Sequence, residues 1–179
     1  VAVWLGVCLN FAFLSKVQTL TPYQGIKAQL FLIATGFVLV AIYNLLLQIL
    51  DWKWTAKFFA IVLVFIGGFS SYFVSSLGAV ISPDQIQNIV QTDPSEATDL
   101  MSLQLLIWTI LFVVIPIAVI AWVKIKPEKL SRILLFKGIN IIGSLAIIGS
   151  LLFVFYLDYA AIFREHRDLK GMISPQNTI

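Results

Sequence analysis

Residues 28–50 read AQLFLIATGFVLVAIYNLLLQIL and contain no charged side chain. At a rise of about 1.5 Å per residue, a helix of this length crosses the roughly 30 Å hydrocarbon core of a bilayer. Four more uncharged runs cover Val1–Leu14, Phe58–Ile81, Leu103–Val123 and Ile139–Leu157. None alternates polar and apolar residues as a barrel strand does. The pattern predicts an all-α integral membrane protein with five transmembrane helices.

The composition of the whole chain agrees with this prediction. Of its 179 residues, 60% are hydrophobic and 12% are charged. A soluble domain carries roughly 45–50% apolar and about 25% charged residues, so this chain has too little polar surface for a water-exposed globule. The excess of three positive charges is spread along hydrophobic sequence, and a basic patch for nucleic acid is therefore not expected. The composition excludes a soluble enzyme, a nucleic-acid-binding module and a disordered chain.

The distribution of cations predicts how the spans are oriented. The segments after the second and fourth runs hold seven Lys and Arg residues, and the other side holds five. The seven are Lys53, Lys57, Lys124, Lys126, Lys129, Arg132 and Lys137. In contrast, Ser82–Ser102 contains no cation and four acidic residues. By the positive-inside rule the seven-cation side is cytoplasmic, and the acidic loop and the C-terminus face outward.

Polar and small residues within the runs are expected to serve mainly helix packing. The amides are Asn10, Asn44, Gln48, Gln104 and Asn140, and amides in such positions usually bond neighbouring helices, although a substrate path is the alternative. Small residues predict close helix approach in the third and fifth runs; they are Gly67, Gly68, Ser70 and Ser71, and Gly143, Ala146 and Ser150. Pro116 predicts a kink in the fourth run. No ionisable residue lies mid-span, which argues against an ion-coupled transporter.

The acidic segment 82–102 predicts two short helices. Ser82, Pro83 and Gln85 have the spacing of an N-cap, a first helical position and a capping box. Asp93, Pro94 and Glu96 repeat that spacing. The break before Pro94 then brings Asn88, Thr92 and Glu96 near one another. An amide, a hydroxyl and a carboxylate beside a membrane suit a polar lipid head group, whereas the structural alternative is that Glu96 only completes the capping box.

Two motifs give this segment a family context. Residues 87–96 read QNIVQTDPSE, which fits QN-x-x-QTD-x-x-E, and residues 163–175 read FREHRDLKGMISP, which fits FR-x-H-x-x-L-x-x-x-I-x-P. Together they closely resemble the membrane domain of the lipid A phosphoethanolamine transferases, a family that includes the mobile colistin resistance enzymes. The motif-bearing resemblance covers about Phe58 to Ile179.

This resemblance implies a bacterial inner-membrane enzyme that moves phosphoethanolamine from phosphatidylethanolamine to a phosphate of lipid A. The family's substrate-site residues correspond to Asn88, Thr92 and Glu96. The threonine nucleophile and the zinc ligands belong to a periplasmic catalytic domain outside this chain, so the chain alone is expected to be inactive and to bind no metal. Its expected partners are phosphatidylethanolamine, lipid A, other membrane lipids and its own catalytic domain.

The predicted organisation has two parts. Residues 1–157 form the five-span domain, including the loop 82–102. Residues 158–179 form a periplasmic interfacial helix, over Asp158–Met172, and the start of a linker. The apolar residues of that helix, Ile162, Phe163, Leu169, Met172 and Ile173, are expected on one face against the outer leaflet. His166 has no evident partners for chemistry, and a solvated or packing role is favoured.

Two alternative functions stay open at this point. The first is the same transfer to another acceptor, such as a lipopolysaccharide core sugar or a periplasmic glucan. The second is a non-catalytic membrane scaffold or transport subunit.

Overall fold

The computed structural model describes residues 1–50, 55–77, 102–124 and 130–175, and these residues form helices and short connections without a strand. The regular α-helices are α1 (Phe11–Leu20), α2 (Ile26–Leu50), α3 (Ala56–Leu77), α6 (Leu103–Thr109), α7 (Ile115–Trp122), α8 (Leu130–Val154) and α9 (Tyr156–Glu165). Two π-helical turns, η1 (Trp4–Cys8) and η2 (Ile110–Val114), and one 3₁₀ helix, η3 (Arg167–Met172), accompany them. The all-helical prediction is confirmed for this part of the chain.

Four helical stretches in the described ranges are long and apolar enough to cross a membrane. They are Ile26–Leu50, Ala56–Ser76, Leu103–Trp122 and Leu130–Val154, and each overlaps one of the last four predicted runs. The last helix begins nine residues before the predicted Ile139 and so includes Arg132 and Lys137, which were expected in the segment before it. The first predicted run, Val1–Leu14, forms two shorter pieces, η1 and α1, which meet at Asn10. The backbone of Asn10, with φ −108° and ψ 22°, interrupts the helix there. A single continuous first span is therefore not what the structure contains.

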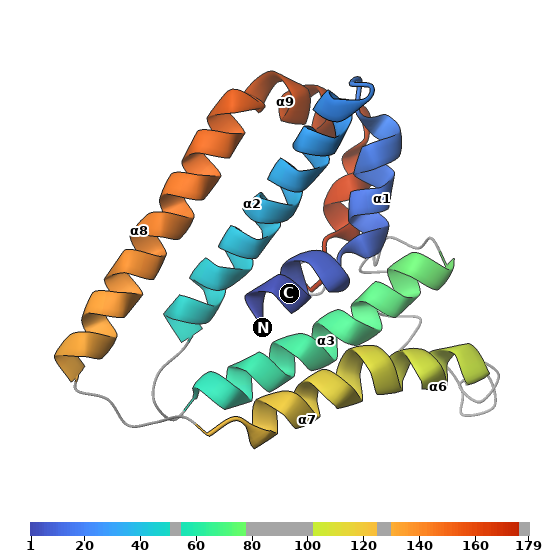
Figure 1. Ribbon diagram of the computed structural model, residues 1–179. Helices are drawn as coiled ribbons and strands as arrows, with labels where there is room; N and C mark the ends of the chain where they lie inside the picture. Colours follow the sequence, from blue (N-terminus) through green and yellow to red (C-terminus); the bar gives the residue numbers. More distant parts are fainter. Residues whose placement is uncertain (51–54, 78–101, 125–129, 176–179) are drawn as a thin grey trace.

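The long helices form two pairs (Figure 1). α2 and α8 run side by side, and α3 lies along the continuous rod of α6, η2 and α7. η1, α1 and the C-terminal segment fill the space between the pairs, where two buried clusters form the core. One centres on Leu5, Leu9, Tyr43, Leu63 and Val64. The other centres on Phe13, Leu14, Val17, Phe31, Leu39, Ile162 and Leu169.

The small residues of α3 and α8 behave differently. A Cβ added to Gly67 would lie 3.0 Å from Leu9 Cδ1, and one added to Gly68 would overlap the side chain of Val113. The close approach predicted at these two glycines is confirmed. A Cβ added to Gly143 meets nothing within 4 Å, so the prediction of close packing there is wrong. Gly143 is exposed on a face of α8 that no described helix covers, whereas the next residue, Ser144, is buried against α2.

Pro116 lies directly after the π-helical turn η2, at the start of α7. Proline has no N–H to offer the carbonyl four residues earlier, which here belongs to Phe112. The indole Nε1 of Trp4 donates to this carbonyl oxygen at 3.4 Å. Pro116 thus coincides with an irregular turn, and a side chain from η1 contacts the carbonyl that the proline leaves without its usual donor.

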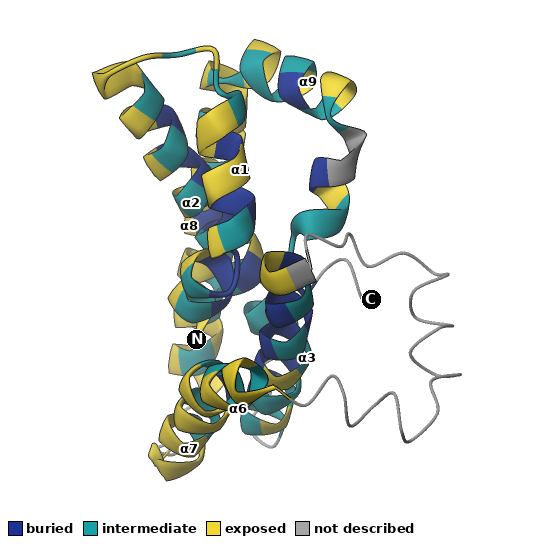
Figure 2. Cartoon of the chain, turned by 90° about the vertical axis from the view of Figure 1, so that its right-hand side faces the viewer, coloured by how far each residue is buried: buried dark blue, intermediate teal, exposed yellow. Residues whose placement is uncertain are grey.

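The C-terminal segment differs from its prediction. Instead of one helix over Asp158–Met172, α9 ends at Glu165, His166 has non-helical dihedrals, and η3 follows. The predicted apolar residues do share a surface, but Ile162 and Leu169 are buried against Phe13, Leu14 and Phe31 of the core. Figure 2 shows the turn between α9 and η3 that directs the chain back along α1. The apolar face packs on protein because α1 offers it an apolar partner, and Ser174 is fully buried instead of starting a surface linker.

Candidate functional site

The three predicted substrate residues, Asn88, Thr92 and Glu96, lie outside the described residues, as do the two short helices predicted around them. The structure does describe the two helices that the loop joins, α3 before it and α6 after it. The geometry of the site is therefore built from these two ends.

The ends of the loop are held together by hydrogen bonds. The hydroxyl oxygens of Tyr72 on α3 and Ser102 are 3.2 Å apart. Ser102 Oγ also accepts from the backbone N–H of Leu105 at 3.1 Å, which caps α6. One turn further, Trp108 Nε1 donates to the carbonyl oxygen of Gly68 at 3.0 Å. We call Tyr72, Ser102 and Trp108 the loop base, because they hold the last turns of α3 against the start of α6.

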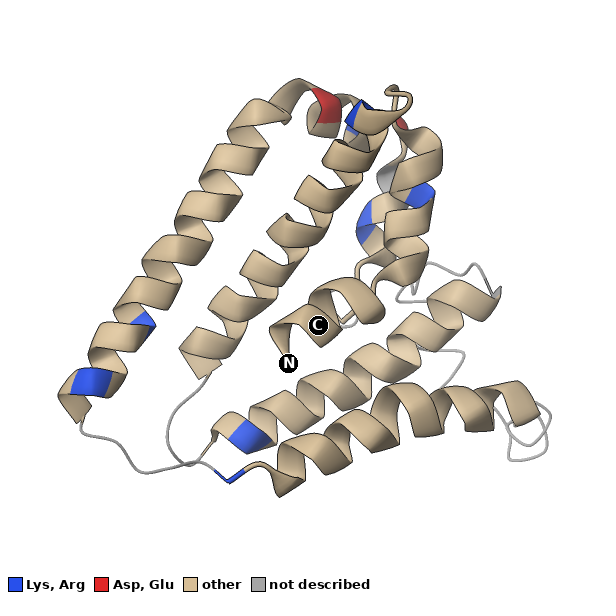
Figure 3. Ribbon diagram, in the orientation of Figure 1, with Lys and Arg blue, Asp and Glu red and all other residues tan. Residues whose placement is uncertain are grey.

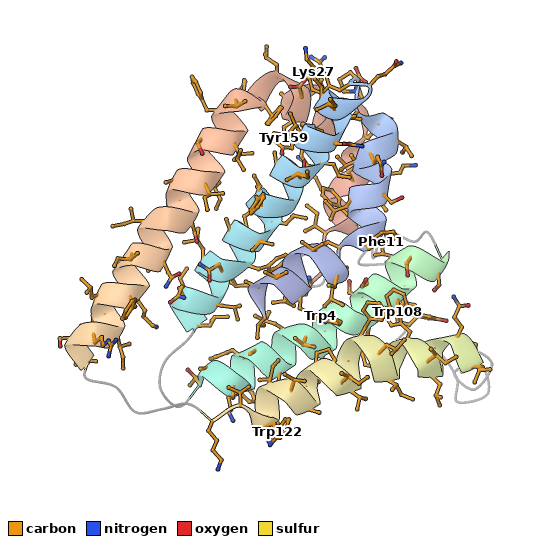
Figure 4. All side chains as sticks on the ribbon, viewed as in Figure 1. Trp4, Phe11, Lys27, Trp108, Trp122 and Tyr159 are labelled. Atoms are coloured by element: carbon orange, nitrogen blue, oxygen red, sulfur yellow. The ribbon has the colours of Figure 1, made fainter. Side chains whose placement is uncertain are left out.

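Aromatic rings extend the loop base toward η1. The Trp108 and Phe112 rings stack with their centroids 4.2 Å apart. The centroids of the Trp4 and Phe112 rings are 5.7 Å apart. Tyr72 meets the edge of Trp108 at 5.9 Å. Figure 4 labels Trp4 and Trp108, which lie over α3 and the α6–α7 rod. Such stacking contributes roughly 0.5–1.5 kcal/mol per pair beyond burial, so the loop base rests on a stiff support.

A second group of polar side chains holds the C-terminal segment inside the bundle. Asn10 Nδ2 donates to the carbonyl oxygens of Leu5 at 2.7 Å and Ser174 at 2.8 Å. The Ser174 N–H donates to Asn10 Oδ1 at 2.9 Å. Tyr43 OH donates to the Ser174 carbonyl at 2.6 Å, and the hydroxyl oxygens of Ser70 and Ser174 are 2.9 Å apart. We call Asn10, Tyr43, Ser70 and Ser174 the C-terminal node.

The contacts of the C-terminal node indicate that it stabilises the fold. All four residues are at most 2% exposed, and no buried polar side-chain atom among the described residues lacks a partner. A satisfied buried network fixes one arrangement of the chain, because each bond lost would leave a polar group unpaired in a low-dielectric interior. Sequence reasoning placed Asn10 among the packing amides and did not find Ser174. The signal for Ser174 was its position inside the second motif, between Ile173 and Pro175.

A third polar contact joins α9 to the start of α2. Tyr23 OH donates to Asp158 Oδ2 at 2.9 Å, and the hydroxyl oxygens of Thr35 and Tyr159 are 2.9 Å apart. The hydrogen bond to Asp158 raises the pKa of the Tyr23 hydroxyl, with burial and the carboxylate charge acting in the same direction. Burial raises the pKa of Tyr159. Both phenols are therefore neutral hydrogen-bonding groups at physiological pH.

A metal centre is a further kind of site that the described residues could contain. No group of three His, Cys, Asp or Glu residues among them could hold a metal ion. His166 is half-buried, and its backbone N–H donates to the Ile162 carbonyl at 2.8 Å as the end of α9. The described part of the chain is thus a helical bundle with two hydrogen-bonded groups: the loop base, which joins α3 to α6, and the C-terminal node, which holds Ser174 inside the bundle.

Comparison with known proteins gives this scaffold a family. The profile of the phosphoethanolamine transferase EptA/EptB family matches residues 39–179. Phosphoethanolamine transferase EptA of Escherichia coli strain K12 is 31% identical over 99% of the chain, and phosphatidylethanolamine transferase Mcr-1 of Escherichia coli is 28% identical over 98%. The chain spans about a third of the length of these relatives, 33% and 32%.

The fold agrees with the same family. The structure of the integral membrane lipooligosaccharide phosphoethanolamine transferase A (EptA) from Neisseria meningitidis superposes with a TM-score of 0.90 at 23% identity, over 99% of this chain and 33% of that one. The match extends along η1 and α1 as well as the four long helices. On its sequence and its fold, the chain belongs to the phosphoethanolamine transferase EptA/EptB family.

Proposed function

We propose that this chain is the membrane domain of an inner-membrane enzyme that transfers phosphoethanolamine from phosphatidylethanolamine to a phosphate of lipid A. The observation that carries the proposal is the family match over residues 39–179, which includes both sequence motifs. In the complete enzyme the chain holds the donor lipid at the membrane surface, and the transfer reaction takes place in the part of the protein that this third of the relatives' length does not include.

The donor site in this proposal is formed by Asn88, Thr92 and Glu96. The carboxylate of Glu96 pairs with the ethanolamine ammonium, and the amide and hydroxyl bond the phosphate or glycerol oxygens. The loop base supports this role, because it holds α3 against α6, the two helices that residues 78–101 connect. In this proposal zinc belongs to the catalytic domain, as the family resemblance implies.

The proposed orientation follows the charges. Figure 3 shows cations and no described acidic residue where α3 and α8 begin, and both cations and acidic residues around α1, α9 and the start of α2 at the other end. In the sequence, the segments at the first end hold seven of the twelve Lys and Arg residues. The cation-rich end is cytoplasmic by the positive-inside rule. The loop and the C-terminal segment then share the periplasmic side.

The donor site is tested with Glu96→Gln in the full-length enzyme. This change keeps the size of the side chain and removes its charge, and Gln is also accepted in a capping box. A charge-assisted bond is worth roughly 1.5–3 kcal/mol, so transfer from phosphatidylethanolamine to lipid A should fall about ten- to a hundredfold. Glu165→Gln, at an exposed carboxylate on α9, is the matched control and should keep the wild-type rate.

Equal rates for both variants at matched membrane levels would show that Glu96 is structural. Full donor-lipid cleavage with no product on lipid A would instead point to another acceptor.

The orientation has its own test in a Cys8→Ser background. An impermeant maleimide should label Asp93→Cys in intact spheroplasts and leave Arg132→Cys unlabelled.

A further inference from the structure

Residues 173–175 lie in the interior of the bundle, where the two buried clusters meet. Ile173 packs against both clusters, and the side chains of Ser174 and Pro175 are fully buried. A Cβ added to Gly67 of α3 would lie 3.5 Å from Pro175 Cδ, an ordinary van der Waals contact. We call residues 173–175 the inserted segment. Its burial shows that it belongs to the core of the bundle and not to its surface.

Ser174 bonds three parts of the bundle through its backbone and its hydroxyl. Its N–H and its carbonyl oxygen bond the side chain of Asn10, between η1 and α1. The carbonyl oxygen also accepts from Tyr43 on α2 at 2.6 Å, and the hydroxyl oxygen lies 2.9 Å from that of Ser70 on α3. An unpaired polar group is unfavourable in a low-dielectric interior. These bonds therefore hold the inserted segment against all three parts at once.

The contact with Ser70 lies close to the end of α3. Ser70 precedes Leu77, the last residue of α3, by seven positions, which is about 10 Å along the helix axis. Tyr72 of the loop base is two positions after Ser70 on the same helix. The chain returns from α9 along α1 toward α3 (Figure 1). The inserted segment therefore lies beside the part of α3 that leads into residues 78–101.

The bonds of Ser174 also determine how freely the chain can move beyond it. The nearest preceding residue that is fully buried is Leu169, which packs in the cluster of Phe13. If the inserted segment left the bundle, the six residues 170–175 could extend over about 20 Å, at roughly 3.3–3.6 Å per residue. The intact bonds remove this slack and keep the chain next to α3.

From this arrangement we infer that the C-terminal node positions the catalytic part of the enzyme beside the donor loop. Ser174, held by Asn10, Tyr43 and Ser70, fixes the start of the connection to that part, and α3 carries the loop from the same place. All four are positioning residues, because each is at most 2% exposed and acts through the chain instead of on the substrate. The inference rests on the proposed function, since it requires a catalytic domain after this chain and a donor site within residues 82–102.

The expected effect of the node is on the rate of transfer and not on the binding of the donor. Transfer requires the donor head group and the reacting side chain of the catalytic domain to meet within one molecule. The rate of such an encounter depends on the length of the connection and on orientation. Slack at the node should lower this rate and leave the donor site itself unchanged, so kcat should fall and KM should not rise.

The test measures kcat, and KM for phosphatidylethanolamine, with the full-length enzyme in nanodiscs that also contain lipid A. Ser174→Trp introduces a ring at a fully buried position, so it should expel the inserted segment. We expect kcat to fall about tenfold or more while KM stays within about twofold of the wild-type value. Lys170→Trp, at an exposed residue of η3, is the matched control and should change neither constant.

Two further variants separate the backbone bonds of Ser174 from its hydroxyl. Ser174→Ala keeps the backbone bonds to Asn10 and Tyr43 and should stay within about threefold of the wild-type kcat. Asn10→Ala/Tyr43→Phe removes both donors to the Ser174 carbonyl and the acceptor of its N–H, and it replaces Ser174→Trp if that variant does not reach the membrane. Amide hydrogen exchange at Ile173 and Ser174 should then rise about tenfold or more, and kcat should fall with it.

The control for this double variant is Asn140→Ala/Tyr159→Phe, which removes an exposed amide and a half-buried tyrosine hydroxyl away from the node. An equal fall in kcat in this control would overturn the inference, because lost stability would then be sufficient. An unchanged kcat in a variant whose amide exchange shows release of the inserted segment would also overturn it, as would a rise in KM alone. A wild-type enzyme that does not cleave phosphatidylethanolamine would contradict the proposed function as well. Glu96→Gln tests the donor site without a change in the node, so the two failures are distinguishable.

Discussion

α2 is packed by η1 on one side and by α8 on another, and the two interfaces are built differently. At η1 the backbones approach so closely that a Cβ added to Gly6 would lie 2.8 Å from the backbone nitrogen of Val40. At α8 contact runs along the whole helix through side chains, with the bond from Asn44 Nδ2 to Ser144 Oγ at 2.9 Å near its middle. A glycine in direct contact with the α2 backbone thus defines the first interface, whereas the second is made by side chains and includes one hydrogen bond between the helices.

This difference shows what holds a membrane helix in place. Lipid tails are as apolar as leucine, so apolar contact alone gives helices little preference for protein over lipid. Close backbone approach supplies that preference where η1 meets α2. The residue after η1's C-cap, Asn10, adds buried hydrogen bonds to the C-terminal segment at Ser174. α8 keeps most of its surface for lipid, since only Ser144 of its residues is buried. Substitutions at η1 should therefore be costly, and equivalent substitutions on α8 should be tolerated.

The largest effect is expected for Gly6→Ala. The added methyl group has to displace the backbone of α2 at Val40, and overpacking of this kind typically costs about 1–3 kcal/mol or more. Gly143→Ala is the matched control, because nothing lies within 4 Å of its added Cβ. Alanine is the better helix former by about 0.5–1 kcal/mol, so the control should be neutral or stabilising. The free energy of unfolding of each full-length variant in mixed detergent micelles measures both effects. Equal losses of unfolding free energy in the two variants would show that the two interfaces do not differ in this way.

The next effect is expected for Asn10→Ala. This variant removes three hydrogen bonds and leaves the N–H of Ser174 without its acceptor in a fully buried position. An unsatisfied buried group costs about 1–3 kcal/mol, so we expect a loss of about 2 kcal/mol in the free energy of unfolding. Asn140→Ala is the control, since Asn140 is exposed on α8 and bonds only the Phe136 carbonyl of its own helix. A release of residues 173–175, seen as new protease cleavage, should accompany the Asn10 change alone.

These two sites also show which features of the fold can be predicted from the sequence. The uncharged runs predicted the four long helices because length and apolarity are local properties, and Gly67 and Gly68 were correctly assigned to packing. Gly143 has the same local signal but faces no protein. Which side of a helix meets a partner depends on tertiary contacts, and residues such as Asn10 and Ser174, 164 positions apart, carry no mark of their pairing.

The C-terminal segment also shows that a local pattern does not identify the partner of an apolar face. Its apolar residues were predicted correctly as one surface, yet they pack on Phe13 and Leu14 of α1 instead of the membrane interface. Amphipathicity shows that a face will be buried and leaves its partner open. The donor-site residues Asn88, Thr92 and Glu96 lie outside the described residues and stay a prediction, which rests on the motif and not on geometry.

A smaller effect is expected where α8 meets α2. Ser144→Ala removes the partner of Asn44 at 2.9 Å, and such bonds between membrane helices contribute about 0.6 kcal/mol on average. We expect a loss of about 0.5–1 kcal/mol, smaller than at Asn10, because the remaining contacts of this interface are spread along both helices. Ser150→Ala, whose hydroxyl bonds the Ile147 carbonyl of its own helix at 3.1 Å, is the control. A loss at Ser144 as large as that at Asn10 would show that α8 also depends on a single polar contact.

The smallest effect, and the only one that should depend on pH, concerns the hydrogen bond from Tyr23 to Asp158, which joins the start of α2 to α9. The protonated phenol makes this bond, so the pKa of Tyr23 is raised. A group with a raised pKa in the folded state stabilises the fold below its unfolded pKa, about 10 for tyrosine, and this contribution disappears as the pH rises through the folded value. Tyr23→Phe should therefore lower the unfolding midpoint slightly at pH 8, and the difference from wild type should shrink once the pH passes well above 10.

Tyr156→Phe, at an exposed tyrosine on α9, controls for general effects of alkaline pH. A difference that stays constant between these pH values would show that the ring of Tyr23, through its contact with Phe31 at 6.1 Å, stabilises this end of the molecule without the help of its hydroxyl.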